Sequence, residues 1–141
     1  MPPATSRRLA RLALPALLVL LPACAANHPH LEGAWVCVEP APAPGQAAAV
    51  KVLADGRFAF GRPGPVPGDP PAGGGTYEYR DGHYVETITY HCAKALVGQT
   101  ITFTCEVEDG LWHHRATFTA NGEPFHIDEV WRRVGEPRPG S

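Results

Sequence analysis

The sequence predicts an all-β domain of eight antiparallel strands that close into an up-and-down barrel. Runs rich in Thr, Tyr, Ile, Val, Phe and Trp recur along residues 48–134, and Asp-Gly or Asn-Gly pairs beginning at positions 55, 81, 109 and 121 separate them. Such pairs favour two-residue hairpin turns, because both central residues of a type I′ turn take a positive φ. Eight strands in hairpin succession can close on themselves, and closure leaves no strand edge exposed.

Residues 1–26 are predicted to be an export leader rather than part of the barrel. Three arginines precede an apolar run at 12–21 that is too short to span a bilayer as a helix. The sequence Leu-Pro-Ala-Cys ending at Cys24 resembles a bacterial lipobox, in which Cys24 would be lipidated and become the first mature residue. Ala-Cys-Ala, ending at Ala25, instead resembles an ordinary signal-peptidase site. We expect an exported, periplasmic protein whose membrane contact would be a lipid on Cys24.

The charge of the remaining chain argues against nucleic acid as a partner. Three of the 12 basic residues and none of the 14 acidic residues lie in the leader, which leaves a net charge of −5 for the rest. No basic stripe follows any expected strand. We expect a tether at 27–30, one barrel domain at 31–134 and a flexible tail at 135–141.

The eight strands are expected at 31–38, 48–53, 57–60, 76–80, 83–90, 100–107, 111–119 and 124–134. Residues 61–75, with the sequence GRPGPVPGDPPAGGG, are expected to form a long loop, because Pro cannot donate to a ladder and Gly weakens a strand. The three Asp-Gly turns then lie at one end of the barrel. The connections at 39–47, 61–75 and 91–99 lie at the other end, with the Asn-Gly turn. This arrangement predicts a closed base and an open mouth.

The turns also determine which side chains face inward. With two-residue loops after Glu108 and Ala120, Trp112 faces Trp131, and His114 faces both Cys105 and Glu129. If strands 83–90 and 100–107 pair so that Tyr90 faces Ile101, Glu86 joins the same row. The rest of this inner face is apolar and aromatic, as in a sheet with one buried side. We expect a ligand to contact Tyr84, Glu86, Ile88, Tyr90, Phe103, His114, Phe118, Phe125 and Glu129.

The polar row of Cys105, His114 and Glu129 has three interpretations. A thiol beside an imidazole and a carboxylate is what a Cys–His nucleophile needs, and the three side chains are also metal ligands. The favoured interpretation is a hydrogen-bonded cluster inside the barrel, because a lone buried polar group is costly. We expect His114 and Glu129 to form a charged pair, and no catalytic residue, metal or cofactor is predicted. Export favours one disulfide among Cys37, Cys92 and Cys105, whose pairing stays open.

The first expected strand carries a family resemblance. Gly33-Ala34-Trp35 is similar to the GxW motif that opens lipocalins and related barrels, where the Trp packs under an Arg near the end of the last strand. Arg133 has the inward parity for that role, and Arg132 is the alternative. More closely, the chain resembles small bacterial secreted lipocalin-like (calycin-type) domains of uncharacterised function, through residues 74–77, 84–90, 96–98 and 129–134. The resemblance implies a barrel and ligand binding, with no assigned activity.

Three functions compete on these observations. The leading hypothesis is an exported lipocalin-like barrel that binds a small hydrophobic or amphipathic molecule in its lumen or mouth, without catalysis or cofactor, because an aromatic face with few polar groups is typical of a small-molecule pocket. The alternative is an envelope protein-interaction or inhibitor module that uses the long mouth loops. Residues 61–75 contain no aromatic residue, which makes them a poor interaction hot spot. A third hypothesis is an enzyme built on Cys105 and His114.

Overall fold

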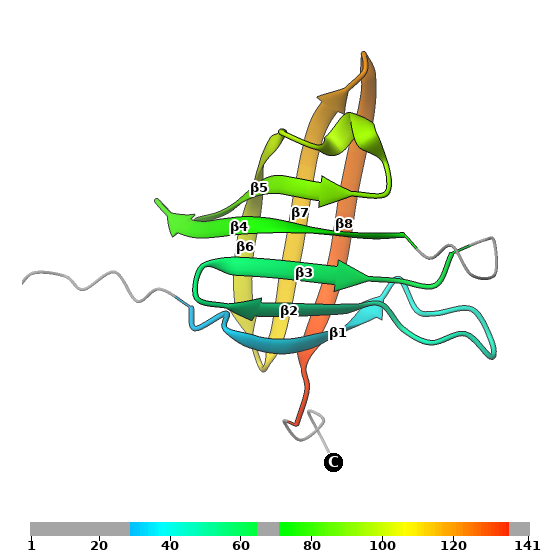
Figure 1. Cartoon of the computed structure of the whole chain (residues 1–141). Helices are drawn as coiled ribbons and strands as arrows, with labels where there is room; N and C mark the ends of the chain where they lie inside the picture. The colour runs from blue at the N-terminus through cyan, green and yellow to red at the C-terminus, as the bar shows by residue number, and fades with distance from the viewer. Residues whose placement is uncertain (1–28, 65–70, 136–141) are drawn as a thin grey trace, which may run out of the picture.

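The structure, a computed structural model, describes residues 29–64 and 71–135 as one closed antiparallel barrel (Figure 1). Each strand pairs with the next and the last pairs with the first, which confirms the predicted eight-stranded up-and-down barrel. A short 3₁₀ helix, η1 (Lys94–Leu96), interrupts the fifth connection. The strands are β1 (Gly33–Glu39), β2 (Val50–Ala54), β3 (Arg57–Gly61), β4 (Ala72–Arg80), β5 (His83–His91), β6 (Thr100–Glu108), β7 (Leu111–Ala120) and β8 (Glu123–Arg133).

The predicted leader and the tail beyond Gly135 lie outside the described residues. Within the two described ranges, no helix is long and apolar enough to cross a membrane.

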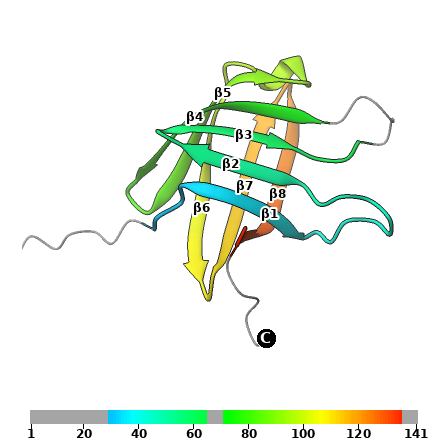
Figure 2. The same ribbon diagram turned by 60° about the horizontal axis from the view of Figure 1, so that its bottom comes forward.

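Four two-residue turns hold the strands in register. Asp55, Asp81, Asp109 and Asn121 have φ values of 48°, 52°, 51° and 53°, and the glycine after each also has a positive φ. This is the type I′ geometry that the Asp-Gly and Asn-Gly pairs predict. In Figures 1 and 2 the β2–β3 and β4–β5 turns lie at the left and the β6–β7 turn at the bottom, whereas the β1–β2 connection lies at the right and η1 at the top. The closed base and the mouth are therefore arranged as expected.

An arginine and three tryptophans close the base. The guanidinium of Arg133 lies over the Trp35 ring, with Cζ 4.4 Å from the ring centre, and donates hydrogen bonds to the carbonyl oxygens of Glu32 and His30. This contact selects Arg133, and not Arg132, as the arginine that caps the tryptophan. The eight-stranded antiparallel barrel and this contact are compatible with a lipocalin-like fold. The buried indoles are Trp35, Trp112 and Trp131.

The structure corrects the expectation that residues 61–75 form a loop, because β4 already begins at Ala72. Gly74 and Gly75 lie where neighbouring backbone approaches too closely for a side chain. A Cβ atom on Gly75 would lie 1.9 Å from the carbonyl oxygen of Thr87, and one on Gly74 would lie 2.6 Å from the carbonyl oxygen of Phe58. Glycine weakens an isolated strand, but here it permits the close packing that pairs β4 with β5.

A β-bulge in β5 reverses the alternation of its side chains. Gly75 pairs with Ile88 and Gly74 pairs with Tyr90, so Thr89 is the extra residue. As a result Ile88 is 3% exposed on the inner face, whereas Tyr90 is 54% exposed on the outer face. The strands β5 and β6 also pair in a different register from the one considered, with Glu86 opposite Ile101. Tyr90 is therefore wrongly predicted as an inward-facing contact.

We predict that Gly75→Ala destabilises the barrel by about 1–3 kcal/mol, because the added methyl group meets the backbone of β5 rather than a movable side chain. Gly61→Ala is the matched control, since a Cβ atom there has nothing within 4 Å, and we expect it to change stability by about 0.5 kcal/mol or less. Urea unfolding followed by tryptophan fluorescence measures both. Equal losses in the two variants would contradict this explanation of the glycines.

Candidate functional site

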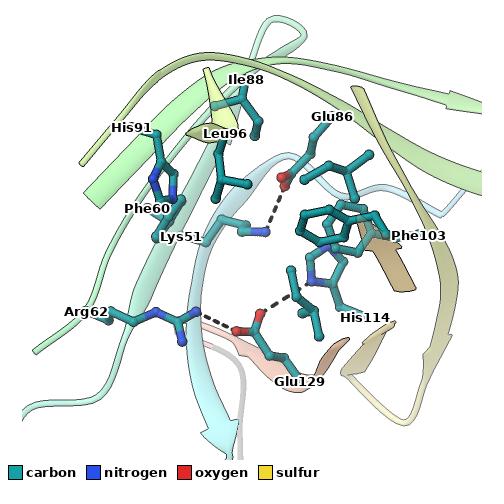
Figure 3. Close-up of a pocket in the computed structure, with 13 residues that line it drawn as sticks. Lys51, Phe60, Arg62, Glu86, Ile88, His91, Leu96, Phe103, His114 and Glu129 are labelled. Atoms are coloured by element: carbon teal, nitrogen blue, oxygen red, sulfur yellow. Dashed lines mark hydrogen bonds and ion pairs between the residues drawn. The ribbon is translucent and has the colours of Figure 1, made fainter. Parts of the chain in front are cut away.

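A pocket of about 70 Å³ opens at the mouth of the barrel (Figure 3). Most of its wall is apolar, from Phe60, Ile88, Leu96, Ile101, Phe103, Phe118 and Ile127. Its polar side chains are those of Lys51, Arg62, Glu86, His91, His114 and Glu129.

A wider groove of about 400 Å³ lies outside this pocket. Both hollows are lined by Phe60, Arg62, His91, Ile127 and Glu129, so these five residues form the passage between them. A molecule that enters the pocket from the groove passes these side chains.

A buried ion pair lies at the inner end of the pocket. Nζ of Lys51 is 2.9 Å from Oε1 of Glu86, and the two side chains are only 4% and 5% exposed. The ammonium group also lies 5.3–5.8 Å from the centres of five aromatic rings, which contribute cation–π attraction in this desolvated place. These rings belong to Phe58, Tyr84, Phe103, Trp112 and Trp131.

Lys51 faces inward because of the turn between β2 and β3. That turn pairs Leu53 with Phe58 and Lys51 with Phe60, which puts all four on one side. The neighbouring Val50 and Val52 are exposed on the outer face. Polarity alone would place the two valines inside and the lysine outside, and Lys51 was not among the predicted contacts. The register that the Asp55 turn sets is the sequence signal that places Lys51 on the inner face.

A second ion pair joins Arg62 and Glu129 at the passage. Nη2 of Arg62 lies 2.5 Å from Oε1 of Glu129, and Cζ of Arg62 lies 5.8 Å from the centre of the Phe60 ring. The other carboxylate oxygen, Oε2, accepts a 3.1 Å hydrogen bond from Nε1 of Trp131. Nδ1 of His114 is 3.5 Å from the same oxygen, which is too long for a well-formed hydrogen bond. Both oxygens of the Glu129 carboxylate therefore accept a hydrogen bond, whereas neither ring nitrogen of His114 makes one within the described part of the chain.

His114 is buried without a hydrogen-bond partner among the described residues. Its ring is 1% exposed, and neither ring nitrogen makes a hydrogen bond. The ring stacks on Phe103, with centres 3.8 Å apart and planes 14° apart. Burial, and then the charge of Lys51, lower the pKa of His114 to about 4, and the contact with Glu129 reverses only part of this.

The expected charged pair of His114 and Glu129 is therefore wrong. Burial by itself would raise the pKa of the Glu129 carboxyl, but its contacts with His114 and Arg62 and the charge of Lys51 hold that pKa at about 2. The carboxylate is ionised and finds its counter-ion in Arg62, and the imidazole beside it stays neutral. Arg62 was not predicted as this partner, because it lies in the stretch 61–75 that was expected to form a loop.

Six of the nine expected ligand contacts line the pocket: Glu86, Ile88, Phe103, His114, Phe118 and Glu129. Tyr84 is fully buried below it, 5.4 Å from the His114 ring between ring centres. Phe125 is exposed and stacks on Phe118. Tyr90 lies outside the barrel, for the reason given above. The lining residues outside the expected set are Lys51, Phe60, Arg62, His91, Leu96, Ile101 and Ile127.

The third member of the polar row does not join the pocket. Cys105 pairs with His114 across β6 and β7, as predicted, but it does not line the hollow. Burial raises the pKa of its thiol to about 11, so the thiolate that a nucleophile needs is scarce at neutral pH. Within the described ranges, no three His, Cys, Asp or Glu side chains gather closely enough to hold a metal ion. Cys37, Cys92 and Cys105 are free thiols.

No protein-family model matches the chain, and no curated protein matches it in sequence. The function of the pocket must therefore be inferred from its own residues.

We predict that Lys51→Met destabilises the barrel by about 3–5 kcal/mol, because it leaves the buried Glu86 carboxylate without a counter-ion. The double variant Lys51→Met/Glu86→Leu removes both charges, and we expect it to regain most of that stability. Arg115→Ala breaks an exposed ion pair with Asp128 and should cost about 0–1 kcal/mol. Chemical unfolding at neutral pH measures all three. If Lys51→Met lowers the free energy of unfolding no more than Arg115→Ala does, the pair of Lys51 and Glu86 is not desolvated.

We predict that stability falls as pH is lowered from about 6.5 to about 4. His114 binds a proton in the unfolded chain at its ordinary pKa of 6.5 but in the barrel only at about 4, so protonation favours unfolding in this window, by about 1 kcal/mol per pH unit. His114→Gln removes this dependence. Glu129, with its pKa lowered from 4.5 to about 2, adds a further loss below about pH 4.5 in both proteins.

Chemical unfolding at several pH values measures how the free energy of unfolding changes with pH in wild-type protein and in His114→Gln. Burial also lowers the pKa of His91, but His91 is present in both proteins, so the difference between them reports His114. Equal slopes between pH 4 and 6.5 would contradict a neutral, buried His114.

Proposed function

We propose that the protein is a binding barrel that takes a small, partly apolar molecule at its mouth. The observation that supports this most strongly is the unpartnered imidazole of His114, which is buried and lines the pocket. An unsatisfied buried polar group costs free energy, and a ligand that hydrogen-bonds to it removes that cost. The apolar walls around it would hold the rest of the ligand, in the usual arrangement of a small-molecule pocket.

The two hollows limit the size of the ligand. The inner pocket of about 70 Å³ holds a group of only a few heavy atoms. The groove of about 400 Å³ outside it has room for a larger remainder. We therefore propose a ligand with a compact polar end that passes Arg62 and an apolar end that rests in the passage and groove. The proposal includes no catalysis and no cofactor.

We place this function outside the cytoplasm, in the periplasm, on the strength of the predicted leader at 1–26. Membrane contact would be a lipid on Cys24, where the lipobox is used. Strand β1 begins, and β8 ends, at the base of the barrel (Figure 1). An anchor attached there would direct the mouth away from the membrane.

We predict that Ile127→Trp abolishes binding, because Ile127 lines both pocket and groove and a larger ring there fills the passage. Val52→Trp is the matched control, since Val52 is exposed on the outer face of the barrel. Three probes that share a phenethyl group report binding: phenethylamine, phenethyl alcohol and hydrocinnamate. Binding is measured as saturable chemical-shift changes in amide NMR spectra, confined to the mouth ends of the strands.

At least one probe should bind the wild-type protein and the Val52→Trp variant and fail to bind Ile127→Trp. Amide spectra of the unliganded variants show whether the barrel is intact. Equal binding by the two tryptophan variants would place the ligand elsewhere. Absence of binding by all three probes to every form of the barrel would contradict the proposed function.

A further inference from the structure

The Arg62 side chain occupies the passage between pocket and groove (Figure 3). Arg62 comes directly after β3, and its guanidinium reaches across the mouth to Glu129 on β8, next to the Phe60 ring. The arginine side chain is 38% exposed, whereas the glutamate side chain is 9% exposed and is also held by the Trp131 indole. The carboxylate is therefore the fixed partner of this ion pair, and the guanidinium is the partner that can leave toward water.

The charges around the pocket balance only while Arg62 is in place. Lys51 is paired with Glu86, Arg62 is paired with Glu129, and His114 is neutral. When the Arg62 guanidinium turns outward, Glu129 is left as a negative charge without a counter-ion. Leaving a largely buried carboxylate unpaired is costly, so the position favours another cation.

The chemistry around Glu129 distinguishes between classes of ligand. An anion entering the pocket would face the carboxylates of Glu129 and Glu86, because the two cations of the lining are already paired with these carboxylates. A cation would replace the lost counter-ion and would also lie among aromatic rings, including those of Phe60 and Phe118, whose faces attract positive charge. A neutral imidazole can accept a hydrogen bond, so the unpartnered His114 ring is suited to an N–H donor near the carboxylate.

We propose that Arg62 is an internal stand-in for the ligand, and that the pocket selects an organic cation, an amine or guanidinium on a short apolar group, which displaces Arg62 from Glu129. The inference rests on the proposed function and makes it more specific. The ligand's cationic group takes the place of the guanidinium beside Oε1 of Glu129. Its apolar part contacts Phe60 and Ile127, which line both the pocket and the groove.

The three phenethyl probes test this choice directly, because they share one apolar group and differ in charge. In wild-type protein we expect phenethylamine to bind more tightly than phenethyl alcohol, and hydrocinnamate to bind most weakly. Glu129→Gln keeps the shape of the side chain and removes its charge. We expect this variant to weaken phenethylamine about tenfold or more and to leave the alcohol within about threefold.

Arg62→Ala supplies the sharper test, because an ordinary contact residue would weaken binding when it is removed. We expect this variant to bind phenethylamine about fivefold more tightly than wild type, since the ligand no longer competes with a partly exposed ion pair. Arg57→Ala is the matched control, with the same change of charge at an exposed position in the β2–β3 hairpin, at the base. It should change the affinity by less than about twofold.

The outcomes separate this inference from the proposed function. Tightest binding of the alcohol or the carboxylate, or weaker binding of phenethylamine by Arg62→Ala, overturns the choice of an organic cation and leaves a binding barrel in place. Binding of phenethylamine by Arg62→Ala but not by wild type supports the inference, because it shows that the arginine blocks the site. Absence of binding by every probe to both proteins overturns the inference and the proposed function together.

Discussion

The register of four type I′ turns is the constraint on which this structure depends. Each turn needs two successive residues with positive φ, and the Asp-Gly and Asn-Gly pairs supply them. Because side chains alternate along a strand, each turn decides which residues face inward. The turn at Asp55 therefore brings Lys51 inside against the polarity of its neighbours, and the turn at Asn121 brings Glu129 inside opposite His114.

These inward charges make the interior of the barrel unusual. A small barrel can be filled by apolar side chains alone, but this one buries an ammonium group against a carboxylate among aromatic rings. The second ion pair differs from the first, since Arg62 is partly exposed and Glu129 is not. The first pair is suited to hold the wall together, and the second is suited to exchange one partner. Between them His114 stays neutral, because burial and Lys51 oppose its protonation.

Most of the fold follows from local signals in the sequence, and the site follows from them only in part. The hairpin turns depend on short stretches of chain, so they were predictable. The tryptophan under Arg133 was implied by the resemblance that the GxW motif carries. The inward position of Lys51 was also encoded, in the register of its turn, but its polarity obscured it. The bulge at Thr89 was not predictable from alternation, because it depends on how closely the glycines of β4 approach β5. That approach turns Tyr90 outward.

The contact between Arg62 and Glu129 joins residues 67 positions apart, and no local pattern predicts it. It requires that the barrel close and that the residue after β3 reach β8. The neutral state of His114 likewise depends on Lys51, which comes from a strand that is not adjacent to β7. Pocket chemistry in this chain is thus a property of the closed barrel rather than of any one hairpin.

The nitrogen chemical shifts of the His114 ring, measured at a pH between 6.5 and about 4, test this account most directly. A neutral imidazole gives two well-separated nitrogen shifts, and an imidazolium gives two similar ones. We expect the neutral pattern for His114 under conditions in which an imidazole with the ordinary pKa of about 6.5 is already protonated. An imidazolium pattern for His114 in that window would mean that it pairs with Glu129 as a cation, and the balance of charge described for the pocket would be wrong.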